Sequence, residues 1–265
     1  MTDDPPQTPA PKAQYRIEAL AKGLHVLRLF DENTTSLRLR EVCERTGLPM
    51  PTAFRIVATL EHEGFIDRGP DGTISPSAAV LTLGSAALRG SSLVQLSEAP
   101  LRELAARTGE TVNLGTLIGD QVLYLVRLRN TDLVTAAVQV GSTLPAIYTS
   151  MGKLLLAHLD PAELETRIAH SFEQHSGGPN AVHDRAELEE RLAAIRADGY
   201  AIQDQELAAG LRSVSVPVRG AGDAVVAAVN IAVSSSRHDV DSLRGELLTR
   251  LQSTAESISS RLRAL

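Results

Sequence analysis

The stretch LREVCERTGLPMPTAFRIV, residues 39–57, decides the fold of the N-terminal part of the chain. Apolar residues recur at helical spacing in its first half, and Gly47 then predicts the end of a short helix. A turn follows, and Pro51 suits the first position of a second helix because its missing N–H would have no partner there. Cys43 is small enough to lie where the two helices cross, and we expect it to fill the core rather than to react. The pattern predicts a helix-turn-helix.

The sequence on either side extends this motif to a small domain. Residues 17–30 carry apolar side chains at helical spacing, which predicts an earlier amphipathic helix. The second helix is expected to end near Gly64. Residues 65–68, a Gly-Pro-Asp-Gly turn and residues 73–75 then predict a two-stranded hairpin. Three helices and a hairpin are the order of a winged helix-turn-helix, which we assign to residues 15–78. Residues 1–14 are acidic and proline-rich, and we expect a disordered tail there.

The predicted winged helix presents a face suited to DNA. The N-terminal end of the second helix in such a motif enters the major groove. Thr52 and Arg55 lie three residues apart on one face of that helix. Arg55 suits a guanine edge or a phosphate, and Thr52 suits a phosphate. The expected DNA contacts are Arg38, Arg40, Met50, Pro51, Thr52, Phe54, Arg55, Arg68 and Thr73.

Two alternatives stay open for this unit. Phe54 either contacts DNA or packs on its own domain. The unit as a whole could instead be an ordinary small helical bundle whose arginines are solvated.

The same segment carries a family resemblance. Thr46, Gly47, Leu48, Pro49, Thr52 and Arg55 match a T-G-L-P-x-x-T-x-x-R pattern. The segment resembles the winged-helix domain of the IclR family of bacterial regulators, and the similarity covers about residues 15 to 263. It implies a double-stranded DNA operator as partner. Arg38 departs from the family, which often has a capping Thr there, and we expect Ser36 to substitute as the cap.

The remaining residues predict an α+β domain with an antiparallel sheet. Residues 79–96, rich in Ala, Leu and Ser, are expected to form a linker helix, and Pro100 to start another helix. Residues 97–265 then alternate between strand and helix patterns. Strands are expected near 112–118, 122–128, 135–140, 200–203, 213–218 and 224–233, and helices near 150–158, 161–170, 185–197 and 240–265. Strands first, helices on one side and strands again indicate one domain.

A second informative stretch is GSTLPAIYTSMGKLLLA, residues 141–157. Thr149 or Ser150 can cap a helix here, which would leave the backbone N–H groups of Met151 and Gly152 at a positive dipole end. Gly152 would let a ligand come close, so the stretch predicts a cradle for a carboxylate. The alternative is a capped helix in which the glycine serves packing alone.

The resemblance extends to residues 199–218 and implies a GAF-like effector-binding domain. In the family the ligand lies between the start of the G-K-x-L-L-A helix and the sheet. Matched residue by residue, Ser150 and Met151 supply helix-end N–H groups, and Gln203, Ser213, Asn230 and Ala232 line the pocket from the strands.

Residues 144–153, LPAIYTSMGK, and residues 204–213, DQELAAGLRS, are similar in sequence to regulators of protocatechuate and 4-hydroxybenzoate catabolism. This resemblance implies an aromatic carboxylate as effector. Tyr148 would stack on the ring or close the loop. Arg212 would pair with the carboxylate or, structurally, with Glu206. The expected effector residues are Tyr148, Ser150, Met151, Gly152, Gln203, Glu206, Arg212, Ser213, Asn230 and Ala232.

Composition and missing motifs narrow the function. The net charge of −6 argues against indiscriminate nucleic-acid binding, and a single cysteine excludes an intramolecular disulfide and a cysteine-cluster metal site. No apolar run is long enough to span a membrane, and a cytoplasmic protein without membrane partners is expected. Nucleophile-elbow, P-loop and dinucleotide motifs are absent.

We therefore expect that the protein is not an enzyme and that it binds no cofactor and no metal. We also expect it to form a homodimer or a dimer of dimers. A hydrolase, a sensor of a non-aromatic acid and a module acting through a protein partner are the alternatives. A further alternative is a zinc site formed by His170, His175, His183 and Asp184, although the spacing of these residues is not that of metal ligands.

Overall fold

The computed structural model describes residues 16–31, 34–129 and 138–265. The predicted tail at residues 1–14 lies outside the described residues, as do residues 135–137 of the third predicted strand. The chain divides between Ser85 and Ala86 into two compact units, each described by itself below. The domain boundaries assigned from the sequence remain predictions.

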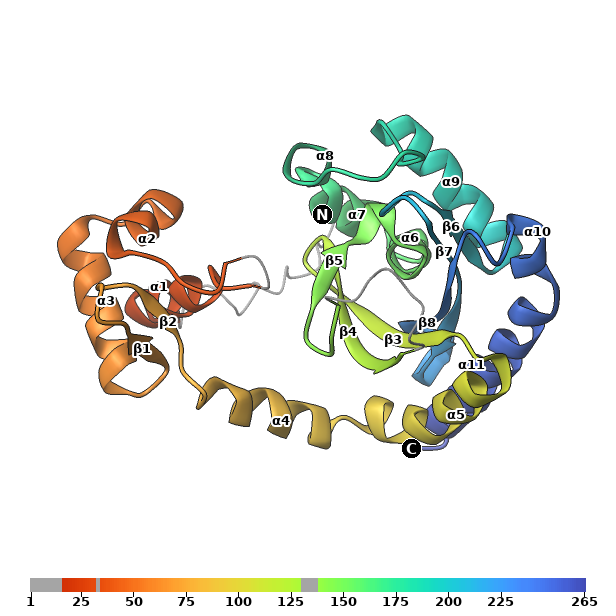
Figure 1. Ribbon diagram of the computed structural model, residues 1–265, viewed down its shortest axis with the longest axis horizontal. Coiled ribbons are helices and arrows are strands. Elements are labelled where there is room, and N and C mark those ends of the chain that lie inside the picture. The colour runs from red at the N-terminus through yellow and green to blue at the C-terminus, as the bar shows by residue number, and fades with distance from the viewer. Residues whose placement is uncertain (1–15, 32–33, 130–137) are drawn as a thin grey trace, which may run out of the picture. The chain divides into compact units, whose positions relative to one another are not determined.

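The first unit is a winged helix-turn-helix (Figure 1). Its elements are α1 (Glu18–Leu27), α2 (Leu39–Thr46), α3 (Met50–His62), β1 (Ile66–Arg68) and β2 (Ile74–Pro76). The two strands pair antiparallel, and Leu37 forms a further bridge to Ile74. One small core holds these elements together, with fully buried Val26, Val42, Ala53 and Val57. The predicted order of three helices and a hairpin is confirmed.

Local chemistry sets the ends of these helices. Helix α2 begins after Arg38, whose backbone N–H donates to Oε2 of Glu41 at 2.7 Å. The predicted cap by Ser36 is therefore wrong, because an acidic side chain inside the first turn satisfies the helix end instead. Gly47 ends α2 with φ +69°, a left-handed conformation that favours glycine. Pro51 lies at the second position of α3 rather than at the first, because the helix already begins at Met50.

Two helices, α4 (Val80–Gly90) and α5 (Ser92–Thr108), follow the wing. The sequence predicts one linker helix that ends at residue 96 and a new helix that starts at Pro100. Both of these helix ends are wrong. The break falls at Ser91, whose hydroxyl accepts the backbone N–H of Val94 and caps α5. Pro100 lies inside α5, where it removes the hydrogen bond to the carbonyl of Leu96 without ending the helix.

The second unit contains a six-stranded antiparallel sheet in the order β5-β4-β3-β8-β7-β6. The strands are β3 (Thr111–Ile118), β4 (Gln121–Leu128), β5 (Thr143–Pro145), β6 (Ala201–Asp204), β7 (Leu211–Arg219) and β8 (Val225–Ser234). The predicted α+β class is confirmed. The strand expected at 135–140 is wrong for its described part, residues 138–140, because the edge strand there is β5.

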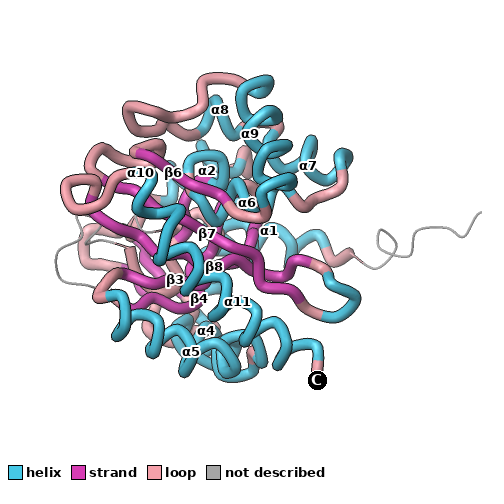
Figure 2. Tube along the Cα trace, turned by 90° about the vertical axis from the view of Figure 1, so that its right-hand side faces the viewer, coloured by secondary structure: helices cyan, strands magenta, loops and turns pink. Residues whose placement is uncertain are grey.

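Helices cover both faces of this sheet, not one (Figures 1 and 2). The helices α5 and α11 (Leu248–Arg263) pack on one face, and α6 (Ser150–Ala157) and α9 (Arg185–Asp198) on the other. Alternation along β7 shows why: Val214 and Val216 face α5 and α11, whereas Ser213 and Ser215 face the opposite side. Side chains near α6 can therefore be polar without disturbing the apolar core between the sheet and the helices α5 and α11.

Short elements complete the unit. They are η1 (Ala146–Tyr148), α7 (Pro161–Ile168), α8 (Ser171–Gln174), η2 (Ala221–Asp223), α10 (Val240–Ser242) and a π-helical turn at Leu243–Leu247. The predicted closing helix is thus interrupted, and Gly245 has non-helical φ and ψ. Within the described ranges, no helix is both long and apolar enough to cross a bilayer.

Candidate DNA interface and effector pocket

Helix α3 of the first unit buries one face and exposes another. Ala53 and Val57 are fully buried in the core, whereas Phe54 is 55% exposed and Met50 is 48% exposed. This exposure leaves Phe54 available to DNA, and its contact with DNA stays a prediction. Large apolar side chains left in solvent near the start of a recognition helix are suited to contacts with base edges and sugars.

Thr52 and Arg55 line a groove of about 520 Å³ between α3 and α1, together with Leu20 and Lys22. The predicted pairing of these two residues on one face holds, and neither is buried. Arg55 forms no ion pair with the other described residues. Its guanidinium is thus available to a phosphate or a guanine.

Other expected DNA contacts already have partners inside the unit. Arg40 Nε lies 2.9 Å from Oε1 of Glu44, and Arg68 makes a two-pronged ion pair with Glu61. Thr73 donates to Asp71 at 2.7 Å within the hairpin turn, and hydrogen bonds from Thr73 lower the pKa of that carboxyl group. Arg68 braces the hairpin against α3, so its charge is partly neutralised. The side chains of Arg38 and Pro51 are exposed.

The second unit encloses a small cavity of about 20 Å³ on the α6 side of the sheet. Four of the residues expected from the sequence line it: Gln203, Ser213, Asn230 and Ala232. The others are Asn113, Tyr124, Arg127, Val138, Leu144, Thr149, Leu207 and Leu211, which sequence analysis missed. Asn113 and Arg127 are detectable in the sequence, since each is a strongly polar residue in a mostly apolar strand.

A chain of hydrogen bonds crosses one end of the cavity. The hydroxyls of Ser150 and Ser213 lie 2.7 Å apart, and Ser213 donates to Oε1 of Gln203 at 3.4 Å. This leaves the amide Nε2 of Gln203 as a donor, and it is buried without a partner among the described residues. An unmet buried donor is costly, so a ligand that accepts from it gains affinity.

A second chain crosses the other end. Arg127 Nη1 donates to Oδ1 of Asn113 at 3.0 Å, and Asn113 Nδ2 donates to Oδ1 of Asn230 at 2.8 Å. Burial lowers the pKa of Arg127, but a guanidinium remains charged in proteins. Arg127 therefore contributes a guanidinium group to this end of the cavity lining.

One of the two backbone N–H groups expected to cradle a ligand at the start of α6 already has a partner. The hydroxyl of Thr149 accepts the backbone N–H of Gly152 at 2.9 Å, so this N–H is already bonded. A Cβ on Gly152 would lie 2.2 Å from the carbonyl oxygen of Ala146, which shows that the glycine permits close packing of η1. Met151 is fully buried in the core. The backbone N–H of Gly152 is therefore used by the cap, whereas the ligand contact expected from the backbone N–H of Met151 stays a prediction.

Four further expected residues also lie outside the cavity lining: Tyr148, Ser150, Glu206 and Arg212. Arg212 pairs with Asp204 at 2.6 Å, not with Glu206, and it faces away from the cavity because it is adjacent to Ser213 on β7. Tyr148 donates to the carbonyl of His175 at 3.4 Å, so it closes a loop rather than stacking in the cavity. Burial raises the pKa of Tyr148.

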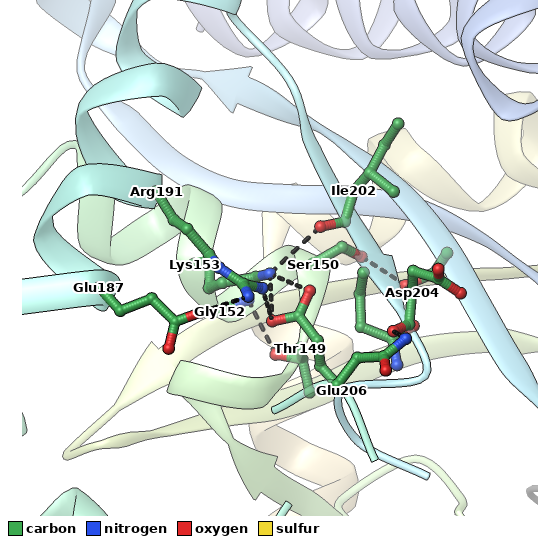
Figure 3. A network of polar contacts seen from close by, with 12 residues as sticks. Thr149, Ser150, Gly152, Lys153, Glu187, Arg191, Ile202, Asp204 and Glu206 are labelled. Carbon is green, nitrogen blue, oxygen red and sulfur yellow. Dashed lines mark hydrogen bonds and ion pairs between the residues drawn. The ribbon is translucent and has the colours of Figure 1, made fainter. Parts of the chain in front are cut away.

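Glu206 belongs to a buried ion network (Figure 3). Lys153 Nζ donates to both carboxylate oxygens of Glu206 and, at 3.2 Å, to the carbonyl of Ile202. Arg191 of α9 lies 2.9 Å from Glu206 and 2.6 Å from Glu187. Burial lowers the pKa of Lys153, and the charge of Glu206 opposes that shift. The network ties α6 to α9 and to the segment after β6.

Comparison with known proteins accounts for both units. Residues 19–70 match the IclR helix-turn-helix domain, and residues 85–260 match the domain described as bacterial transcriptional regulator IclR C-terminal. The chain belongs to the IclR family of transcriptional regulators. Members of this family bind DNA through the first domain and a small organic effector through the second.

Several IclR relatives cover most of the chain. The Pca regulon regulatory protein of Pseudomonas putida is 32% identical over 92% of this chain and 84% of its own length. The p-hydroxybenzoate hydroxylase transcriptional activator of Acinetobacter baylyi is 29% identical over 91% and 90%. The acetate operon repressor of Salmonella typhimurium is 29% identical over 88% and 85%.

Solved structures agree with the IclR fold. An IclR family regulator from Brucella abortus has a TM-score of 0.81 at 25% identity, covering 95% of each chain. An IclR homologue from Microbacterium hydrocarbonoxydans, complexed with 4-hydroxybenzoate, has a TM-score of 0.72 at 27% identity, covering 94% of this chain and 100% of its own. These relatives are regulators rather than enzymes, so the hydrolase alternative falls away.

Two histidines of the predicted zinc group in this IclR chain have separate partners. His175 Nε2 lies 2.8 Å from Oδ2 of Asp120, and Nδ1 of His170 lies 3.5 Å from Glu173. Asp184 accepts the backbone N–H of Glu187 and caps α9. No group of three or more metal-ligating side chains gathers within the described ranges.

Proposed function

We propose that this IclR regulator senses a small aromatic carboxylic acid in the cavity beside Ser213. The chemistry of the lining carries the proposal. No Asp or Glu is among the described residues that line the cavity, whereas Arg127 and several amide and hydroxyl groups are. A lining of this kind attracts an anion and supplies donors to its oxygens.

Apolar side chains between the polar ends support a ring. Tyr124, Leu144, Leu207 and Leu211 line the cavity, and the ring of Tyr124 suits an aromatic neighbour. Two relatives named for Pca and p-hydroxybenzoate genes, and a structural neighbour complexed with 4-hydroxybenzoate, support an effector of that class.

The volume of the cavity has a consequence for regulation. About 20 Å³ is space for roughly one water molecule, which is far less than an aromatic acid occupies. Lining side chains must therefore move when an aromatic effector binds. A ligand that binds only the opened arrangement shifts the protein toward it, which is the requirement for a switch.

A small aliphatic acid is the second candidate, and the same volume favours it. The acetate operon repressor among the relatives also supports it. A panel of acids of graded size separates the two candidates.

The DNA-bound form is proposed to be a homodimer on a pseudo-palindromic site, or a dimer of dimers, acting in the cytoplasm. Two-fold symmetry of the protein is mirrored by symmetric half-sites. Leu81 and Leu83 of α4 are 75% and 58% exposed, which supports pairing of this helix between chains. Light scattering and gel shift on operators with altered half-site spacing test this.

The decisive experiment combines binding and response. The purified chain is titrated by calorimetry with 4-hydroxybenzoate, 3,4-dihydroxybenzoate, benzoate, pyruvate and acetate, and each acid is then added to a gel shift with DNA upstream of the gene. We expect binding of an aromatic acid and a change in DNA affinity. Tight binding of pyruvate or acetate alone would establish the aliphatic candidate. Binding of no acid, or turnover of one, would overturn the proposed function.

A further inference from the structure

Three polar side chains lie opposite one another across the middle of the sheet. The register pairs Arg127 of β4 with Asn113 of β3, and Asn113 with Asn230 of β8. These strands are neighbours in the sheet (Figure 1), and all three residues line the cavity. Paired residues on adjacent strands point to the same face, so the three form one row beneath the cavity.

The chemistry of arginine fixes the direction of the hydrogen bonds in this row. A guanidinium only donates, so the side-chain oxygen of Asn113 must face Arg127. The NH₂ group of Asn113 then faces Asn230 and bonds its oxygen at 2.8 Å. The NH₂ group of Asn230 is consequently turned away from Asn113, and it donates to no other described residue.

Asn230 is nearly fully buried, with 4% of its surface exposed, and so is Gln203 with 1%. The hydrogen bonds from Ser150 to Ser213 and from Ser213 to Gln203 likewise leave the NH₂ group of Gln203 without a partner among the described residues. Two amide donors from different strands thus line one cavity, but only that of Asn230 is oriented by a charged residue.

We propose that Asn113 and Arg127 determine the selectivity of the cavity for a carboxylate over the corresponding carboxamide, with Asn113 acting as a positioning residue that holds the NH₂ group of Asn230 toward the ligand. The inference rests on the proposed function and adds the source of its charge selectivity. A carboxylate only accepts, so both of its oxygens suit this site. A carboxamide would turn its own NH₂ group toward the NH₂ group of Asn230 or Gln203, and two donors that face each other would oppose its binding.

The Asn113→Asp substitution tests the orientation with almost no change in shape. Aspartate still accepts from Arg127, but its carboxylate cannot donate to Asn230 and it neutralises the arginine. The amide of Asn230 is then expected to turn its NH₂ group toward Asp and its oxygen toward the cavity. We expect the ratio of carboxylate to carboxamide affinity to fall at least about tenfold, and the carboxamide to bind no more weakly than before.

Two substitutions at Arg127 complete the series. Arg127→Met removes both the charge and the orientation, so it should also lower the ratio. Arg127→Lys keeps a charged donor and should restore most of the selectivity, which a merely structural role would not predict. The matched control is Arg219→Met, which removes a half-buried arginine of β7 that is paired with Asp223, and it should leave the ratio unchanged.

Calorimetry on the full-length chain measures the ratio with matched pairs, 4-hydroxybenzoate with 4-hydroxybenzamide and pyruvate with pyruvamide. Circular dichroism confirms that each variant is folded, and a misfolded Asn113→Asp leaves the two Arg127 variants to decide. An unchanged ratio in the folded variants would overturn this inference and leave the proposed function intact. Failure of the unsubstituted chain to bind any acid would overturn both.

Discussion

The ammonium group of Lys153 on α6 bonds both carboxylate oxygens of Glu206, and the two side chains are 2% and 3% exposed. Glu206 lies between pocket residues Gln203 and Leu207 along the chain. The ion pair therefore fixes the start of α6 against a segment that forms part of the cavity wall.

Removing one partner of this ion pair should lower the stability of the second unit. We expect Lys153→Met to lower the free energy of unfolding by about 3 kcal/mol, because it leaves a buried carboxylate with only Arg191 as a partner. The double variant Lys153→Met with Glu206→Met should recover most of that loss. Urea unfolding of the full chain measures both values, and hydrogen exchange of α6 amides assigns them to the second unit. A double variant as unstable as the single one would show that the charges are not the cause.

Two glycines should respond in opposite directions to the same substitution. Gly152→Ala brings a Cβ to 2.2 Å from the backbone of Ala146, and we expect a loss of at least about 2 kcal/mol. Gly84 lies in α4 with no atom within 4 Å of the added Cβ, so Gly84→Ala should stabilise this helix by about 1 kcal/mol. Thermal unfolding of the two variants checks the signs. A stable Gly152→Ala would mean that η1 can shift away from α6.

The winged helix was predictable because its determinants are local. Gly47 with its positive φ, the apolar spacing of three helices and the turn between β1 and β2 can all be found within short stretches of sequence. The break at Ser91 was missed because a serine cap and a proline compete as signals. The structure shows that the cap determines the start of α5 and that Pro100 is tolerated inside it.

The cavity was only partly predictable, because it depends on pairings between distant strands. Tyr124 and Arg127 are three positions apart, which would place them on opposite faces of a regular strand, yet both line the cavity. A register shift between Leu114 and Gly115 brings them to one face, and no single sequence reveals such a bulge. The placement of Arg212 was predictable, since it and Ser213 are neighbours on one strand and cannot share a face.

Arg55 supplies the most direct test of the DNA interface. Arg55→Ala should weaken operator binding about tenfold or more, because an exposed guanidinium beside Thr52 is lost. If the contact is to a phosphate, the slope of affinity against salt should fall by about 1. Gel shifts at several salt concentrations measure both, with Arg102→Ala in the second unit as control. Effector affinity should not change, and loss of both functions would indicate a damaged fold.

Ser213 tests the pocket independently of DNA binding. Ser213→Leu replaces one oxygen by three carbons where only about 20 Å³ is open, and it breaks the hydrogen bond to Ser150. We therefore expect it to abolish the effector response and to leave operator affinity as it was. Because overpacking also costs about 1–3 kcal/mol of stability, Ser213→Ala is the milder companion. It removes the hydroxyl that orients Gln203 without filling the cavity, and effector affinity should fall only several-fold, by about 1 kcal/mol. Calorimetry and gel shift on both variants separate the two effects, and normal effector affinity in Ser213→Leu would place the binding site elsewhere in the domain.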